Sequence, residues 1–417
     1  MGKRRKRRAT EAFEVIKGGD RVVNFQLISN KKLRTVATKK NLSLSDFKQG
    51  DIKNCGLISP LAALSQRDEY YEDIAPKVEN EDHLSFNIFL KGTPTKILVN
   101  KSLPFDENMS LVYAQSNKDI LSIAAFFEKV FVKCCCNYKY DNCKYIPPNL
   151  VFRTFSRYMT SFRQYEDDDH KEDLMTYIVK LFEKKSSAVI GISPDLSVDL
   201  NVDNEDDNED DNHMYFLENY NVEHNAIKLY DPACSQEFCI NNGDLPQWFQ
   251  ENSDVSNGSY WIKLEQLEKR SCQISSLHHK DYHKIIKSFT MDFAKSEFDK
   301  LEIQKNVCTI NTKTESSVSV NYFCISHEPS DCDILVFNEK GEEVSIDFDL
   351  PYSGYTSQCK LPNEPKLEMF QEFNLKAGIF TLAISIKLEK KIKKKFESLL
   401  RVASKSFVSI SSLKSER

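Results

Sequence analysis

The stretch "QGDIKNCGLIS", Gln49 to Ser59, places one cysteine at the start of an apolar run, six residues after a glutamine. A thiol at a helix N-terminus is a candidate nucleophile, because the helix dipole favours the thiolate. Such a nucleophile also needs a base, a group that orients the base, and donors for the oxyanion that forms on the substrate. The alternative is that Cys55 is only a small buried residue at the edge of a core.

Composition narrows the class of protein. With 417 residues and 40% hydrophobic residues, the chain is long enough for two or three globular domains. A net charge of −5 argues against a nucleic-acid partner. The charge is uneven, since "MGKRRKRRA" opens the chain and the acidic run "DNEDDNEDD" covers residues 203–211. We expect a cytoplasmic protein with a solvated basic tail, and a nuclear signal in that tail is the alternative reading.

The cysteines are expected to be thiols. There are twelve of them, and no apolar export segment follows the basic start. The triplet Cys134–Cys136 with Cys143 lacks the C-x2-C spacing of zinc sites, so a zinc site is disfavoured.

Hydrophobic periodicity predicts helices first and strands later. Apolar residues recur at helical spacing near Leu57–Leu64, in residues 119–135 and in residues 173–187. Residues 83–100, "HLSFNIFLKGTPTKILVN", read as a β-hairpin around "KGTP". Further strands are predicted in "AVIGIS", "HMYFLENY", "AIKLY" and "GSYWIKLEQL". Because strands follow helices rather than alternating with them, the fold class is α+β.

Beyond about residue 285, short β segments separated by turns predict an antiparallel β-sandwich. The predicted division is a basic, disordered tail (1–38), a core (39–275), the sandwich (286–408) and a short tail (409–417). Within the core, residues 39–165 form a helical lobe and residues 166–275 a β-rich lobe.

Two residues of the β-rich lobe could serve the thiol. Among eight histidines, His213 stands apart because it follows the acidic run and opens a strand. Asp231 ends the next strand, before Pro232. Adjacent strands can hold an imidazole and a carboxylate side by side, facing the helix that bears Cys55. The plainer readings are a strand-end histidine and a turn aspartate.

In this order the residues resemble the papain-like fold and, in detail, the calpain family. Gln49, Gly50 and Cys55 stand at the spacings of the family's Q-G-x-x-G-D-C-W segment, and Asp46 matches its upstream aspartate. Four further stretches resemble family motifs in the family's order: "FFEKVFVKCCCNYKY", "HMYFLENY", "IKLYDPAC" and "GSYWIKLEQL". The resemblance covers roughly residues 40–408.

The resemblance implies a papain-like two-lobed cysteine protease core followed by a C2-like antiparallel β-sandwich. It implies a calpain-like cysteine endopeptidase that cleaves intracellular proteins at limited sites through a thioester acyl-enzyme. Cys55 would be the nucleophile, His213 the base and Asp231 the orienting group, where the family usually has asparagine. Gln49 would donate to the oxyanion, and one such donor is worth about 3 kcal/mol in comparable sites.

Some residues depart from the family pattern. Gly56 and Ala233 stand where the family has tryptophan, and Asn212 replaces the glycine before the histidine. Pro60 either lies within the cysteine helix or, capped by Ser59, starts it and leaves Cys55 outside. These departures keep open a catalytically inactive interaction or scaffold protein. An acyl-transferase of transglutaminase type is a third reading, which Asp231 allows.

Cofactors and partners follow from the same resemblance. No cofactor is needed for the chemistry, and calcium as a regulator is left open. Asp46 is a weak candidate ligand, whereas Lys139 stands where a ligand glutamate is expected. The expected partners are protein substrates. The basic loop "KKIKKK", residues 390–395, could contact acidic lipid, although a solvated loop is the favoured reading.

Overall fold

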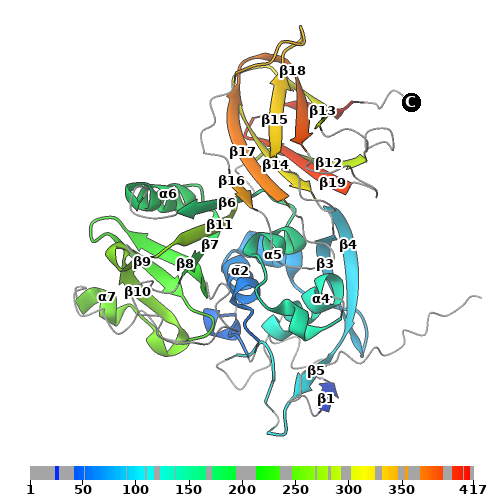
Figure 1. Ribbon diagram of the computed structural model, residues 1–417. Coiled ribbons are helices and arrows are strands. Elements are labelled where there is room, and N and C mark those ends of the chain that lie inside the picture. Colours follow the sequence, from blue (N-terminus) through cyan, green and yellow to red (C-terminus); the bar gives the residue numbers. More distant parts are fainter. Residues whose placement is uncertain are drawn as a thin grey trace, which may run out of the picture.

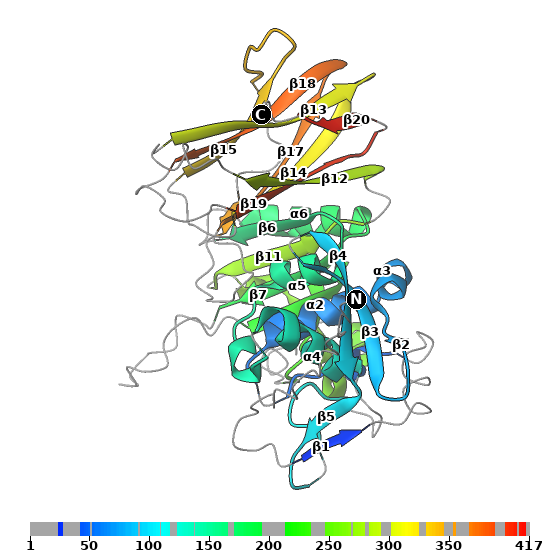
Figure 2. The same cartoon turned by 90° about the vertical axis from the view of Figure 1, so that its right-hand side faces the viewer.

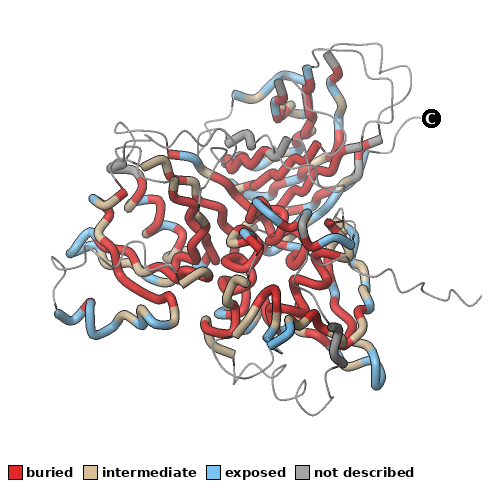
Figure 3. Tube along the Cα trace, turned by 60° about the horizontal axis from the view of Figure 1, so that its bottom comes forward, coloured by how far each residue is buried: buried red, intermediate tan, exposed pale blue. Residues whose placement is uncertain are grey.

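The computed structural model shows two lobes and a β-sandwich (Figure 1). The residues that it describes are 24–27, 42–50, 52–90, 92–108, 110–116, 123–136, 138–165, 171–193, 213–234, 247–267, 270–279, 283–292, 302–324, 331–345, 353–355, 367–387, 397–406 and 408–413. The basic start, the acidic run and the "KKIKKK" loop lie outside these residues. Buried segments run through all three bodies, whereas exposed residues gather on outer loops (Figure 3).

The first lobe combines helices with small sheets. Its helices are α2 (Cys55–Ser65), α3 (Asp68–Ile74), α4 (Ile123–Cys135) and α5 (Pro148–Phe155), with short 3-10 turns η2 (Leu44–Asp46) and η3 (Tyr140–Cys143). Its strands are β1 (Asn24–Leu27), β2 (Lys77–Val78), β3 (His83–Leu90), β4 (Thr93–Asn100) and β5 (Ser102–Phe105). The predicted hairpin is confirmed, since β3 and β4 pair antiparallel across Gly92, whose φ of 75° suits glycine.

Helix α2 is the central element of this lobe. Leu57, Leu61 and Leu64, which were expected to share an apolar face, are all buried. Helices α4 and α5 pack beside α2 in the same core. The predicted disordered tail (1–38) is wrong in one place, because strand β1 lies within it and pairs with β5.

The second lobe is an antiparallel sheet. Its strands are β6 (Thr160–Tyr165), β7 (Ser187–Ile192), β8 (His213–Asn221), β9 (Ala226–Tyr230), β10 (Ser259–Lys263) and β11 (Cys272–Leu277). They lie in the order β10-β9-β8-β7-β11-β6. The other elements are α6 (Lys171–Glu183), α7 (Gln247–Glu251), η6 (Val255–Asn257) and η7 (Leu264–Leu267). The predicted lobe boundary at 166 is too late, because β6 already belongs to this sheet.

The C-terminal body consists of two antiparallel sheets around one apolar core. One sheet contains β12 (Ile285–Asp292), β14 (Ser316–Cys324), β16 (Ser353–Tyr355), β17 (Leu367–Leu375) and β19 (Glu397–Ser404). The other contains β13 (Glu302–Thr312), β15 (Asp331–Phe337), β18 (Gly378–Lys387) and β20 (Ser409–Ser412). The predicted tail from residue 409 is wrong in part, because β20 pairs with β13.

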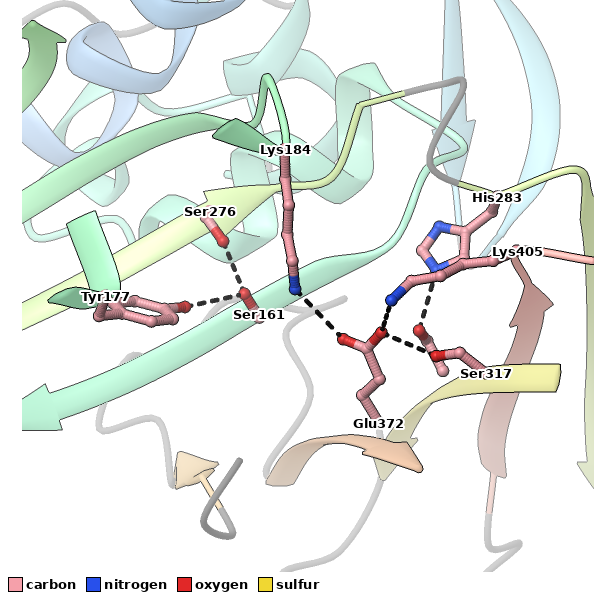
Figure 4. Close-up of polar contacts among 9 residues, drawn as sticks. Ser161, Tyr177, Lys184, Ser276, His283, Ser317, Glu372 and Lys405 are labelled. Atoms are coloured by element: carbon pink, nitrogen blue, oxygen red, sulfur yellow. Dashed lines mark hydrogen bonds and ion pairs between the residues drawn. The ribbon is translucent and has the colours of Figure 1, made fainter. Parts of the chain in front are cut away.

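The sandwich is fixed to the edge of the second lobe, with β16 and β17 against β6 (Figures 1 and 2). The side chain of Asn321 extends the edge strand: its Oδ1 accepts from the Thr160 backbone N at 3.1 Å, and its Nδ2 donates to the Thr160 carbonyl at 2.7 Å. Glu372, buried in the same junction, lies 2.6 Å from Nζ of Lys405 and 3.7 Å from Nζ of Lys184 in the second lobe (Figure 4).

In the part of the chain that the structure describes, no helix combines the length and the apolar character needed to cross a membrane.

Candidate active site

Cys55 is the first residue of helix α2. The carbonyl of Asn54 accepts hydrogen bonds from the backbone N of Leu57 at 2.8 Å and of Ile58 at 3.1 Å, which opens the helix. The thiol therefore lies at the positive end of the helix dipole, where a thiolate is favoured. The residue as a whole is half-buried.

Pro60 lies inside α2 and does not start it. Of the two placements left open by the sequence, the one that keeps Cys55 in the helix is observed. The proline removes the N–H that would bond the Gly56 carbonyl, a loss that helices tolerate poorly. A neighbouring contact supports the helix here, because the hydroxyl of Ser59 donates to the carbonyl of Met214 at 2.7 Å. This bond also joins α2 to strand β8.

His213 and Asp231 lie side by side at the ends of strands β8 and β9. Nε2 of His213 is 2.7 Å from Oδ1 of Asp231, whose side chain is fully buried, whereas the imidazole is 21% exposed. The aspartate is held from two further sides. The same Oδ1 accepts from the backbone N of Ala233 at 2.8 Å, and the Asp231 backbone N donates to the carbonyl of Gly258 at 2.8 Å. The carboxylate thus has a fixed direction towards the imidazole.

The imidazole of His213 also hydrogen-bonds the Cys55 thiol. Burial opposes the charged form of each group, but the hydrogen-bond and charged partners of each outweigh burial. The pKa of Cys55 is lowered by the hydrogen bond and charge of His213 and by the backbone N–H groups of Met214 and Gly56, against burial. The pKa of His213 is raised to about 10, because contacts with Asp231 and Cys55 outweigh its burial. Both shifts favour a thiolate–imidazolium pair.

Gln49 lies in the segment before α2 and contacts the loop that follows Asp231. Its backbone N donates to the carbonyl of Pro232 at 2.8 Å, which ties it to the loop after Asp231. Its Oε1 is buried and has no hydrogen-bond partner among the described residues. The neighbouring Gly50 packs against the backbone of Tyr113 so closely that an added Cβ would lie 2.2 Å from the carbonyl oxygen. The backbone of Gln49 is therefore held beside the loop after Asp231, and the fold does not use its buried amide oxygen.

The comparison with known families agrees with this arrangement. A family model described as calpain family cysteine protease matches residues 25–298, which is more than half of the chain. The chain belongs to the calpain family. The matched region spans both lobes of the calpain core and reaches past strand β12 at the start of the sandwich. Among curated proteins, no match to this calpain was found.

The structure explains why this calpain has glycine after the cysteine. A Cβ added to Gly56 would lie 1.9 Å from the carbonyl oxygen of Ile146. That segment is fixed to the nucleophile loop, since the backbone N of Tyr145 donates to the carbonyl of Lys53 at 3.1 Å. The space beside Cys55 is thus filled by another part of the chain. Tyr145 is 52% exposed and has a φ of 54°, a strained value for an aromatic residue.

Three bonds not anticipated from the sequence join the first lobe to strand β9 and to the residues that follow β11. The hydroxyl of Tyr230 in β9 donates to the carbonyl of Phe47 at 3.0 Å, and that of Tyr70 in α3 donates to the His278 carbonyl at 2.9 Å. Nε2 of His279 lies 2.8 Å from the carboxylate of Glu69. No local pattern signals such pairs, because their partners are far apart in the sequence.

The candidate calcium ligand Asp46 makes hydrogen bonds within the first lobe. One carboxylate oxygen accepts from the backbone N of Ser43 at 2.7 Å, and the other accepts from the hydroxyl of Ser116 at 2.9 Å. Lys139 is exposed at the start of η3. Within the described residues, no group of three or more His, Cys, Asp or Glu residues is placed to hold a metal.

Proposed function

We propose that this calpain is a cysteine endopeptidase that cleaves proteins at limited sites through a thioester acyl-enzyme. The observation that carries the proposal is the continuous chain from Cys55 through His213 to Asp231, with the thiol at the start of α2. A helix N-terminus, an imidazole and an orienting carboxylate are the three groups that activate a thiol for attack.

The proposed reaction begins with attack of the Cys55 thiolate on the carbonyl carbon of a peptide bond. The carbonyl electron pair moves to oxygen, where the Cys55 backbone N–H and the Gln49 side-chain amide donate hydrogen bonds. His213 then gives its proton to the leaving amine as the C–N bond breaks, which leaves a thioester. Neutral His213 takes a proton from water, and the hydroxide formed hydrolyses the thioester and frees the carboxylate product.

Asp231 would orient His213 throughout. Its 2.7 Å contact with Nε2 leaves the other ring nitrogen for the thiol. Where calpains usually have asparagine, the carboxylate adds a negative charge that stabilises the imidazolium. We expect this charge to extend the ion pair to higher pH than a neutral amide would.

No step of this mechanism uses calcium. Both carboxylate oxygens of Asp46 are occupied by hydrogen bonds, and the residues nearby do not form a metal site within the described chain. Contacts between the lobes, such as Tyr230 with Phe47, hold the proposed triad together instead.

We further propose that the C-terminal sandwich is C2-like and that the protein acts on intracellular proteins. The two-sheet architecture supports the first proposal, and the free cysteines of the described residues support the second. A contact between acidic lipid and the 390–395 loop stays a prediction, because that loop lies outside the described residues.

Labelling with an active-site-directed epoxide that alkylates papain-like cysteines tests the function. Wild type, Cys55→Ala and His213→Ala would be compared by mass, with and without calcium. We expect one label per chain, at Cys55, which is lost in Cys55→Ala and strongly reduced in His213→Ala. Labels spread over other cysteines and indifferent to His213 would instead leave a calpain-shaped interaction protein. Amine incorporation into glutamine substrates would point to an acyl-transferase.

A further inference from the structure

Glu128 is a carboxylate in the interior of the first lobe. It lies on α4 with 0% exposure, and its helix neighbours Phe127, Val130 and Phe131 are equally buried. In the described part of the chain, no cation pairs with it. An apolar side chain would be cheaper to bury here, because a carboxylate loses its hydration. This cost indicates that the polar contacts of Glu128 have a role.

The two carboxylate oxygens bond two separate segments. Oε1 accepts from Nδ2 of Asn54 at 2.6 Å, and Oε2 accepts from the backbone N of Ala114 at 3.0 Å. Burial raises the pKa of Glu128 to about 7, against these two bonds. Tyr140 and Cys143 face it from η3, and burial holds the pKa of both well above the usual range, so neither adds a charge.

The first segment carries the nucleophile. Asn54 is the N-cap residue of α2, but its side chain makes no capping bond and is directed to Glu128 instead. Its carbonyl accepts the first hydrogen bonds of the helix. The orientation of the Asn54 peptide therefore sets the direction of the next backbone N–H, which is that of Cys55.

The second segment, around Ala114, contacts the residues on either side of Gln49. Gln115, the residue after Ala114, exchanges two backbone bonds with Lys48, at 3.0 and 2.8 Å. Gly50 packs on the carbonyl of the tyrosine that precedes Ala114. These contacts fall on both sides of Gln49, so the position of Ala114 sets the position of the glutamine.

We propose that Glu128 is a positioning residue of the oxyanion hole: one carboxylate fixes the backbone N–H of Cys55 relative to the side chain of Gln49. It acts through Asn54 and Ala114 and touches neither the substrate nor the reacting atoms. This inference rests on the proposed function, because an oxyanion hole matters only if Cys55 attacks a carbonyl.

Two reagents distinguish an effect on the oxyanion hole from an effect on the reactivity of the thiolate. A peptide aldehyde adds reversibly to Cys55: the sulfur bonds the carbonyl carbon, and the carbonyl electron pair moves to the oxygen, which lies in the oxyanion hole. That oxygen then takes the proton of His213 to give a hemithioacetal. Iodoacetamide reacts without an oxyanion, because the thiolate displaces iodide directly. The ratio of aldehyde affinity to alkylation rate at Cys55 thus reports the oxyanion hole.

In Glu128→Leu, which loses both bonds, we expect the aldehyde affinity to fall about 10- to 100-fold, as for partial loss of an oxyanion donor. The alkylation rate at Cys55 should stay within about threefold, because the helix and His213 still favour the thiolate. Glu128→Gln should restore the affinity to within about threefold of wild type: its Oε1 can accept from Ala114, and its Nε2 can donate to Asn54 once that amide rotates.

Asn54→Ala provides the same comparison if Glu128→Leu does not fold, and the aldehyde affinity should again fall selectively. Glu372→Gln is the matched control, since it neutralises another buried carboxylate, at the junction with the sandwich (Figure 4). Glu372→Gln should change neither the aldehyde affinity nor the alkylation rate at Cys55. The thermal midpoint of every variant would be recorded, so that loss of folded protein is corrected for.

Three results would overturn the inference: an unchanged aldehyde affinity in Glu128→Leu or Asn54→Ala, a parallel loss for both reagents, or no rescue by Glu128→Gln. A wild-type protein in which Cys55 reacts with neither reagent would contradict the proposed function itself. The failures of the two proposals are therefore distinguishable.

Discussion

The carboxylate of Asp231 lies 2.7 Å from Nε2 of His213 and is held there by the backbone N–H of Ala233 and by the bond of its own backbone N to Gly258. Gly258 has a φ of 84°, and an added Cβ would lie 2.3 Å from the Asp231 carbonyl oxygen. Only glycine suits this position. The local backbone thus fixes the direction in which the carboxylate meets the imidazole.

Asp231→Asn should keep this geometry, because an amide oxygen can accept from both His213 and Ala233. It removes a charge that helps to raise the pKa of His213 to about 10. The imidazolium is lost as the pH rises through that pKa, and it must give its proton to the leaving amine, so the alkaline limb of the peptide-cleavage rate should move to lower pH in the variant. An alkaline limb that does not move would contradict the role of the charge.

The same pair should make stability depend on pH. The folded-state pKa of His213, about 10, exceeds its usual 6.5, so its contribution is complete below about pH 6.5 and is lost as the pH rises through 10. Cys55 acts in the opposite sense: its pKa is lowered from 9.0, so its contribution is present above pH 9 and is lost as the pH falls through the folded value. Denaturant unfolding of wild type and His213→Gln across pH 5–11 would measure this. A stability difference that does not shrink towards pH 11 would refute it.

The order of residue types was enough to predict much of the fold and three residues that the structure brings together. Helical and alternating periodicities reflect local burial, so the hairpin of β3 and β4 and the helix at residues 123–135 could be predicted. Cys55, His213 and Asp231 were picked by type and position, and the structure brings them together.

Features that depend on distant partners could not be predicted. Glu128 and Asn54 are 74 residues apart, and no local pattern joins them. The carbonyl of Ile146 fills the space next to Gly56, whereas the sequence shows only that the tryptophan of the family pattern is absent there. The sequence predicts a tail where strand β20 forms, because its pairing partner, β13, lies far earlier in the chain.

Gly56→Ala should destabilise the protein by about 1–3 kcal/mol, because the added methyl would overlap the Ile146 carbonyl and force the backbone to shift. Gly56→Trp, which restores the family's residue, should be worse rather than better. Gly341→Asn is the control: nothing lies within 4 Å of its added Cβ, and asparagine tolerates a positive φ. Denaturant midpoints would be compared. A stable, more active Gly56→Trp would show that the 145–146 segment does not fill this space.

Glu372→Gln should loosen the attachment of the sandwich. Burial disfavours its charge, but Lys184 and Lys405 outweigh burial and lower the pKa of Glu372 to about 2. Because this pKa is below the usual 4.5, the contribution of Glu372 is present above pH 4.5 and is lost as the pH falls through 2. We expect the variant to lose about 1–3 kcal/mol near neutral pH, since both lysines are partly exposed and screened.

Limited proteolysis in the connection between β11 and β12 would report the loosening directly, and cleavage there should be faster in Glu372→Gln than in wild type. The control is Glu79→Gln, which removes the exposed ion pair with Lys96 in the first lobe and should leave the cleavage rate unchanged. Equal cleavage rates in wild type and Glu372→Gln would mean that the Asn321–Thr160 bonds and apolar packing alone hold the sandwich in place.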